Sequence, residues 1–162
     1  MEQQEIFLFI KSAKKNLLNY YILKEGIYMT EPAGKILPFL SFKGNAEEAV
    51  NFYISVFPGA KILSLEYITD KAYGKPGKIL NVLFEIMGQQ FMAMDMDEQH
   101  SPNFSWAVSM YINCDSEEEF DMIFGRLSEG GLIMMGPEPV LEFKKVAWVT
   151  DKYNFTWQLV WK

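Results

Sequence analysis

The acidic segment in the middle of the chain contains the only histidine, so it is the first candidate for chemistry. Asp95, Asp97 and Glu98 precede His100, and carboxylates beside an imidazole can hold a metal ion or exchange protons. Pro102 and polar neighbours follow, and charged runs of this kind are usually solvated. The segment is therefore predicted to be an exposed loop joining two halves of the chain, with a metal site as the alternative.

Cys114 is the only cysteine, which excludes an internal disulfide and fits a reducing compartment. It lies just before an expected helix, whose dipole could lower the pKa of the thiol. A nucleophilic cysteine also needs a positioned base, and the sequence shows none nearby. A structural role is the favoured prediction.

Several other side chains could contact a small molecule. Ser109 could hydrogen-bond a ligand, or its hydroxyl could be satisfied by backbone within a strand. Aromatic and methionine side chains could line an apolar pocket or belong to the ordinary core, namely Phe84, Met92, Met94, Trp148 and Trp157. Both interpretations stay open at this point.

The composition excludes several classes of function. The 162-residue chain is 49% hydrophobic and 15% aromatic, ample for one domain or two small units that share a core. Its formal charge is −6 and Arg126 is its only arginine, so it lacks the clustered cations that nucleic acid binding needs. No apolar run approaches the roughly 18 residues of a membrane helix. Glycine-rich turns for a methyl-donor cofactor or a phosphate are missing as well.

Residues Met1–Tyr28 differ from the rest, because a short apolar run precedes the lysines, the reverse of a signal peptide. An amphipathic surface helix is one interpretation. The other is that the native start is Met29, since Lys24-Glu25-Gly26 can be encoded by a ribosome-binding sequence. We accordingly predict an N-terminal extension over 1–34 and a domain over 35–162.

Within that domain the same order of features occurs twice, in halves of about 35–97 and 104–162. In the first half, Asn45 is a predicted N-cap with Glu48 at the third helical position, and Pro58-Gly59 ends the helix. In the second, Ser116 and Glu119 form a capping box, and Gly130-Gly131 is the stop. Expected strands cover 36–42, 60–69, 78–86, 90–96, 106–114, 132–135, 145–151 and 155–161. The pattern predicts an α+β fold of two tandem β-α-β-β-β units, which form a curved eight-stranded mixed sheet around a cleft with helices outside.

Particular stretches resemble the PhnB-like branch of the vicinal oxygen chelate superfamily, which includes glyoxalases, bleomycin-resistance proteins and dioxygenases. The resemblance covers about Lys35 to the C-terminus. Its segments are Gly44–Ala49 with Asn51–Tyr53 and Phe57, then Val108-Ser109, Asn113–Asp115, Trp148–Tyr153 and Trp157–Leu159. Asn154 stands where such relatives usually have glycine, and asparagine tolerates left-handed backbone angles. The resemblance also implies a homodimer that completes its clefts across a two-fold interface.

Metal-dependent members of the superfamily place ligands on the first and last strands of each half. Counting from Phe52-Tyr53 puts Pro38, Met92, Ser109 and Gln158 at those positions. Of these side chains only the glutamine is a reasonable ligand for a divalent ion, and a shift of the count onto Asp95 would not by itself rescue the site. The resemblance therefore implies the scaffold without its metal, and we expect no cofactor.

The leading hypothesis is a cytoplasmic bacterial protein that holds a small, partly apolar molecule in a metal-free cleft. Pro38, Phe84, Met92, Met94, Ser109, Trp148 and Gln158 are the expected cleft residues. Two alternatives remain at this stage. One is a metal-independent enzyme that uses Ser109, Gln158 or an acidic residue, and the other is a dimeric module with a filled cleft. The expected partners are a second copy of the chain and an unidentified small molecule, with neither nucleic acid nor membrane.

Overall fold

The computed structural model of the protein describes residues 31–162. The expectations for Met1–Tyr28 and for a native start at Met29 fall outside these residues. Among residues 31–162, no helix is long and apolar enough to cross a membrane.

The described chain consists of two units with the predicted order of elements. The first unit contains β1 (Phe39–Phe42), α2 (Ala46–Val56), β2 (Lys61–Tyr67), a short 3-10 turn η1 (Lys71–Tyr73), β3 (Ile79–Ile86) and β4 (Gln89–Asp95). The second contains β5 (Met110–Asn113), α3 (Glu117–Ser128), β6 (Leu132–Val140), β7 (Phe143–Thr150) and β8 (Thr156–Trp161). The tandem β-α-β-β-β prediction and the α+β class are confirmed.

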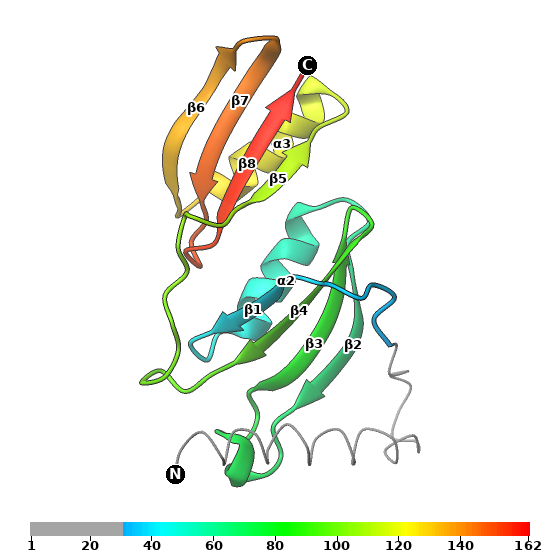
Figure 1. Ribbon diagram of the computed structural model, residues 1–162, viewed down its shortest axis with the longest axis vertical. Helices are drawn as coiled ribbons and strands as arrows, with labels where there is room; N and C mark the ends of the chain where they lie inside the picture. Colours follow the sequence, from blue (N-terminus) through cyan, green and yellow to red (C-terminus); the bar gives the residue numbers. More distant parts are fainter. Residues whose placement is uncertain (1–30) are drawn as a thin grey trace.

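The eight strands form two four-stranded sheets and not the single continuous sheet that we expected. The strand orders are β1-β4-β3-β2 and β5-β8-β7-β6, each with one parallel pair and two antiparallel pairs. Figure 1 shows the two sheets one above the other, joined by the segment after β4. The two units contact each other through α2, α3 and the β7–β8 turn. For example, the guanidinium of Arg126 in α3 donates a hydrogen bond to the hydroxyl of Ser55 in α2 at 3.1 Å.

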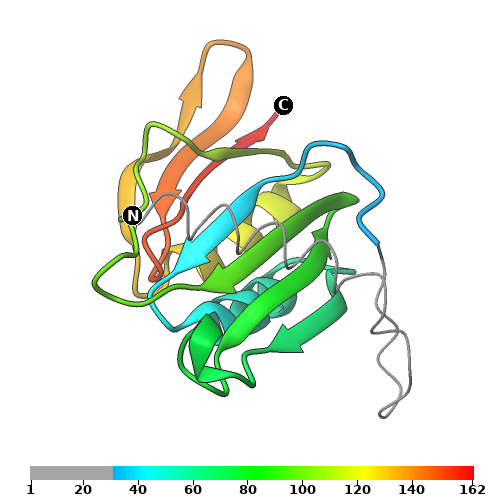
Figure 2. The same ribbon diagram turned by 60° about the horizontal axis from the view of Figure 1, so that its bottom comes forward.

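Each helix covers one face of its own sheet, in both views (Figure 1 and Figure 2). The helices bury Ala49, Val50 and Tyr53 of α2 and Phe120, Ile123 and Leu127 of α3. Strand side chains alternate between the two faces of a sheet. Phe91 and Ala93 of β4 are therefore buried against the helix, while Met92 and Met94 lie on the opposite face. Each sheet thus has one face without a helix, which we call its open face.

A single hydrophobic core runs through both units. Trp157 of β8 is 1% exposed and its ring lies 5.4 Å from that of Tyr53 and 5.1 Å from that of Phe57, both from the first unit's helix region. Phe104 of the linker contacts Phe42 of β1 and Phe155 before β8 with edge-to-face geometry. Burying aromatic rings of this size contributes about 1.5–3 kcal/mol each. The two units are consequently held together by the core rather than by strand pairing.

The two helix N-termini are capped by different means. Ser116 Oγ accepts a hydrogen bond from the Glu119 N–H at 3.2 Å, which confirms the capping prediction for α3. Asn45 occupies the N-cap position of α2, as predicted, but its side chain makes no capping hydrogen bond. Asp95, at the end of β4, accepts the Ala46 N–H at 2.8 Å in its place. Tertiary structure supplies a cap that local sequence spacing could not indicate.

Asp151 forms a second buried acceptor site, at the β7–β8 turn. It is 2% exposed, and its Oδ1 accepts the N–H groups of Tyr153 and Phe155 at 2.8 and 3.1 Å. Its Oδ2 accepts the indole N–H of Trp157 at 2.8 Å. Burial raises the pKa of Asp151, although these hydrogen bonds lower it in part. Asn154 completes the turn with φ 67°, the left-handed conformation predicted for it.

Candidate functional site

Three of the expected cleft residues come together on the open face of the second sheet. Gln158 of β8 lies beside Trp148 of β7 in the strand register, opposite in direction to the buried Trp157 and Leu159. The Gln158 amide Nε2 donates to the Ser109 hydroxyl at 2.8 Å. A hydroxyl, an amide and an indole therefore share one surface.

Trp148 carries a buried N–H group without a hydrogen-bond partner among the described residues. Leaving a buried donor unpaired costs about 1–3 kcal/mol. The Trp106 ring lies 5.9 Å from the Trp148 ring, and Trp106 itself is 62% exposed. A ligand oxygen that reached this N–H would remove the cost, and the two rings would flank its apolar part.

Two residues of this surface were not singled out from the sequence as candidate site residues. Tyr111 is 53% exposed and adjoins Gln158 in the β5–β8 register. Trp106 precedes the strand that was expected to begin with it, because β5 starts only at Met110. The alternation of side chains along β5 could have identified Tyr111, which is two residues from Ser109. Nothing in the local sequence places Trp106 against Trp148.

The open face of the first sheet holds Met92 and Met94. The strand register sets Phe39 of β1 beside Met92 and Ser41 beside Met94. Phe39 is 48% exposed, and both methionines are partly buried. Flexible thioethers adapt to irregular apolar shapes, so this face suits a partner surface or the apolar part of a ligand.

The structure separates Phe84 and Pro38 from the other expected cleft residues. Phe84 is fully buried on the helix-covered face, stacked on Phe91 at 5.3 Å, so its position fits the ordinary core. Trp157 lies in the same core. The alternation along β1 gives Pro38 the direction of Leu40 and Phe42, which are buried against α2.

The acidic segment is a solvated loop, as predicted. The side chains of Asp97 and His100 are 70% and 78% exposed and lie 3.9 Å apart. Asp95 is not part of this surface, because its carboxylate is buried and takes the N–H groups of Ala46 and Ile79. Residues 31–162 contain no group of three or more His, Cys, Asp or Glu side chains that could hold a metal ion. The positions that the resemblance assigns to the metal ligands hold Pro38, Met92, Ser109 and Gln158, a set of side chains that does not match the donors of a divalent metal centre.

Cys114 is buried, and its thiol pKa is raised to about 12 by that burial and by the nearby charges of Glu119 and Asp115. The helix dipole does not lower it, contrary to the possibility that its position before α3 suggested. A thiol that keeps its proton at neutral pH is a poor nucleophile. The position supports a structural role.

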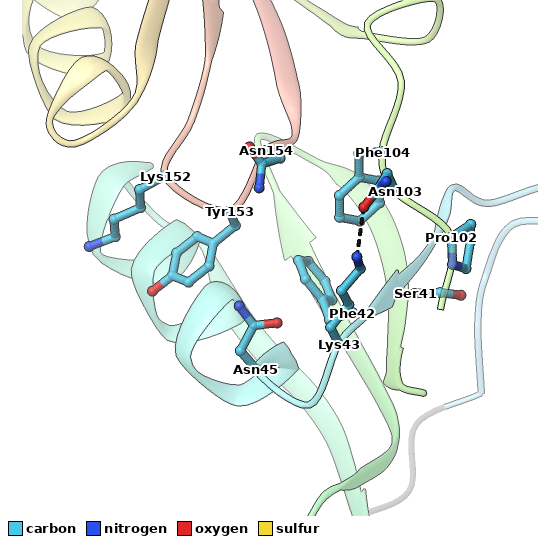
Figure 3. Close-up of a pocket in the computed structure, with 10 residues that line it drawn as sticks. All are labelled: Ser41, Phe42, Lys43, Asn45, Pro102, Asn103, Phe104, Lys152, Tyr153 and Asn154. Carbon is cyan, nitrogen blue, oxygen red and sulfur yellow. Dashed lines mark hydrogen bonds between the residues drawn. The ribbon is translucent and has the colours of Figure 1, made fainter. Parts of the chain in front are cut away.

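A pocket of about 290 Å³ lies at the junction of the two units (Figure 3). Its walls come from the end of β1, the linker after β4 and the β7–β8 turn, and none of its residues was expected to form the cleft. The lining residues are Ser41, Phe42, Lys43, Asn45, Pro102, Asn103, Phe104, Lys152, Tyr153 and Asn154. The Lys43 ammonium donates to Asn103 Oδ1 at 2.6 Å across this space.

Comparisons with known proteins agree with the architecture. Residues 34–160 match the model of a family described as 3-demethylubiquinone-9 3-methyltransferase. A PhnB protein from Bacillus cereus is 39% identical with a TM-score of 0.75, and the match covers 80% of this chain and all of that one. Protein PA1353 from Pseudomonas aeruginosa is 24% identical with a TM-score of 0.65, covering 80% and 98% of the two chains. Among curated proteins, none matches the chain.

The fold is also that of a metal-binding resistance protein. The fosfomycin resistance protein FosX from Listeria monocytogenes, in a complex with Mn(II) and dihydroxypropylphosphonic acid, has a TM-score of 0.58 at 18% identity. The match covers 80% of this chain and 93% of that one. At this identity the likeness concerns the fold alone, and that fold is the one expected of the vicinal oxygen chelate superfamily.

Proposed function

Since the chain belongs to the PhnB-like family described as 3-demethylubiquinone-9 3-methyltransferase, we propose a function that this scaffold can perform with the residues present: it binds a small, partly apolar molecule against the open faces of its sheets. A bacterial cytoplasm is the proposed location, in line with a single buried thiol and with bacterial relatives. The ligand is held without a metal ion.

The family's descriptive name implies a methyl donor, and the described residues do not fit one. Cofactors of that kind are commonly held at a glycine-rich turn between a strand and a helix of a doubly wound parallel sheet. Here each sheet is mixed, and the Ala46 N–H at the start of α2 is already taken by the Asp95 carboxylate. Residues 31–162 therefore do not offer a cofactor site of that kind.

The observation that carries the proposal is the unpaired indole N–H of Trp148 beside the Ser109–Gln158 pair. A ligand carbonyl or ether oxygen that displaced the groups covering this buried N–H would accept from Trp148, and the amide and hydroxyl would orient a second polar group. The rings of Trp106 and Tyr111 offer apolar surface on the same side. Pockets with mostly apolar walls and a few convergent polar groups are typical small-molecule sites.

A second copy of the chain supplies the opposite wall in this proposal. Trp106, Val108 and Tyr111 are 62%, 64% and 53% exposed around Ser109, and a cluster of exposed apolar side chains usually marks an interface or a ligand site. The methionine face around Met92 is an adaptable apolar surface that could close over it. The proposed assembly is a symmetric homodimer with two such clefts.

Binding can be tested with a fluorescent apolar probe, anilinonaphthalene sulfonate, and with native mass spectrometry of protein purified from its own host. Trp148→Phe keeps an aromatic ring and removes the N–H, so we expect several-fold weaker probe binding. Trp161→Phe is the matched control, because Trp161 points to the other face of the same sheet. Equal affinities in the two variants would refute the assigned site. A monomer in light scattering at micromolar concentration would refute the two-chain cleft.

A further inference from the structure

We propose that the pocket at the junction of the two units is a second binding site, which takes a small organic acid through its carboxylate. This site borders the open face of the first sheet only through Ser41, which lies beside Met94. It shares no residue with the Ser109, Trp148 and Gln158 surface, and it is built from three chain segments that the fold brings together. Figure 3 shows polar side chains from these segments extending toward one space.

The charge of the pocket favours an anion. The chain carries a formal charge of −6, yet none of the ten lining residues is acidic and two are lysines. The Lys43 ammonium has three N–H groups and donates one of them to Asn103, so two remain as donors for a ligand. Lys152 lines the wall with its stem while its ammonium lies 4.3 Å from the centre of the Phe52 ring, so it adds positive charge without a direct contact. Outside the lining, the Asp95 and Asp151 carboxylates are already held by hydrogen bonds, while the charge of Glu48 acts on Tyr153 at one end of the pocket.

Three asparagine side chains supply the neutral hydrogen bonds. Asn45 stands at the start of α2, but its amide makes no capping bond and extends toward the pocket (Figure 3). Asn154 occupies the left-handed position of the β7–β8 turn, where glycine would satisfy the backbone equally well and would offer no side chain. Asn103 accepts from Lys43 through its oxygen, which leaves its NH₂ group as a donor. An ammonium and three amides together match a carboxylate with a further polar substituent.

The size and the remaining wall indicate that the acid has an apolar body. A volume of about 290 Å³ equals roughly ten water molecules at about 30 Å³ each, more than an inorganic anion fills. Phe104 and Tyr153 contribute aromatic surface to the lining, and Phe42 closes the buried end. A ring or short chain attached to the carboxylate would lie against these side chains. The proposed class is therefore a small cyclic or aromatic carboxylic acid.

Occupation of this pocket would link the two units, because Lys43 and Asn45 belong to the first, Asn154 belongs to the second and Asn103 belongs to the linker. A ligand that bridges them binds the folded junction and not the unfolded chain, so it stabilises the protein in proportion to its concentration. Binding of an acid would thus be visible both as local contacts and as thermal stabilisation.

The test is a titration of the isotope-labelled full chain with benzoate, with its neutral analogue benzamide, and with inorganic phosphate at constant ionic strength. The readouts are the side-chain amide signals of Asn45, Asn103 and Asn154 and the indole signals of the tryptophans. We expect saturable amide shifts with benzoate, at least tenfold weaker binding of benzamide, and weaker binding of phosphate, which cannot use the apolar wall. Lys43→Met should weaken benzoate binding about tenfold, whereas the exposed Lys75→Met should not.

Each other outcome overturns the proposal. Equal binding of benzoate and benzamide would show that the pocket does not recognise a carboxylate. Binding of phosphate as tight as that of benzoate would show that the ligand need not be an organic acid. Shifts confined to the indole of Trp148 would place the ligand on the open face and would leave that separate proposal standing. Asn154→Gly keeps the turn and removes one amide, so unchanged benzoate binding in that variant would also contradict the assigned site.

Discussion

Replacing Asp151 by asparagine tests the claim that one buried carboxylate organises the junction. The carboxylate accepts three hydrogen bonds, two from backbone and one from the indole of Trp157. Asparagine keeps one oxygen for the backbone donors. Its NH₂ group then takes the place of Oδ2, 2.8 Å from the indole nitrogen, where two donors face each other.

The magnitude follows from these contacts. A hydrogen bond to a charged acceptor contributes about 1.5–3 kcal/mol, and an unpaired buried donor costs about 1–3 kcal/mol. The neutral amide avoids the burial of a charge, which offsets part of this loss. We expect Asp151→Asn to lower the free energy of unfolding by about 2–3 kcal/mol at neutral pH.

The pH dependence adds a second signature. Burial raises the pKa of Asp151, so the folded protein holds this proton more tightly than the unfolded chain does. The group therefore contributes stability that is fully present below its unfolded pKa of about 3.9 and is lost as the pH rises through the folded pKa. Asp151→Asn removes this contribution, so its stability should change less with pH across that window.

The assay is denaturant unfolding followed by circular dichroism and tryptophan fluorescence, from below the unfolded pKa of about 3.9 to neutral pH. Asp115→Asn is the matched control, since Asp115 is exposed and should lose under about 0.5 kcal/mol. A loss below about 0.5 kcal/mol in Asp151→Asn would refute the proposed role of the carboxylate. If the stability of Asp151→Asn depends on pH in the same way as that of the unmodified protein, the raised pKa of Asp151 is refuted.

Three further outcomes are expected. Ser116→Ala should lower the free energy of unfolding by about 1 kcal/mol, whereas Asn45→Ala should lower it clearly less because the Asn45 side chain does not cap α2. A larger loss in Asn45→Ala than in Ser116→Ala, measured by equilibrium unfolding, would contradict the cap assignment. Gly136→Ala should be far more destabilising than Gly59→Ala, although both glycines have positive φ. A Cβ at Gly136 would overlap the backbone oxygen of Val146, whereas a Cβ at Gly59 would meet no atom within 4 Å, so similar melting temperatures of the two variants would contradict this prediction. Cys114 should resist a thiol reagent at mildly alkaline pH until the protein is unfolded, and fast labelling of the native protein would show that its pKa is not raised.

The order of helices and strands was predictable because it rests on local periodicity. Apolar residues at spacings of three and four marked α2 and α3, and glycine or proline marked their ends. The final turn was predictable for a different local reason, because Asn154 is one of the few residues other than glycine that tolerate a left-handed backbone. The placement of Ser109 and Gln158 on one surface came from the resemblance, which assigns them to the first and last strands of the second half, and the structure brings the two side chains within 2.8 Å.

The chain sequence by itself thus determined the elements, their order and the duplicated unit, since each of these depends on neighbours a few residues apart. Only the tertiary structure decided that the eight strands form two sheets, and that Phe84 and Pro38 are directed away from the open face. It alone made Asp95 the cap of α2, across a separation of 49 residues. The junction pocket depends in the same way on segments distant in sequence, whose approach is set by packing of the shared core and not by any local pattern.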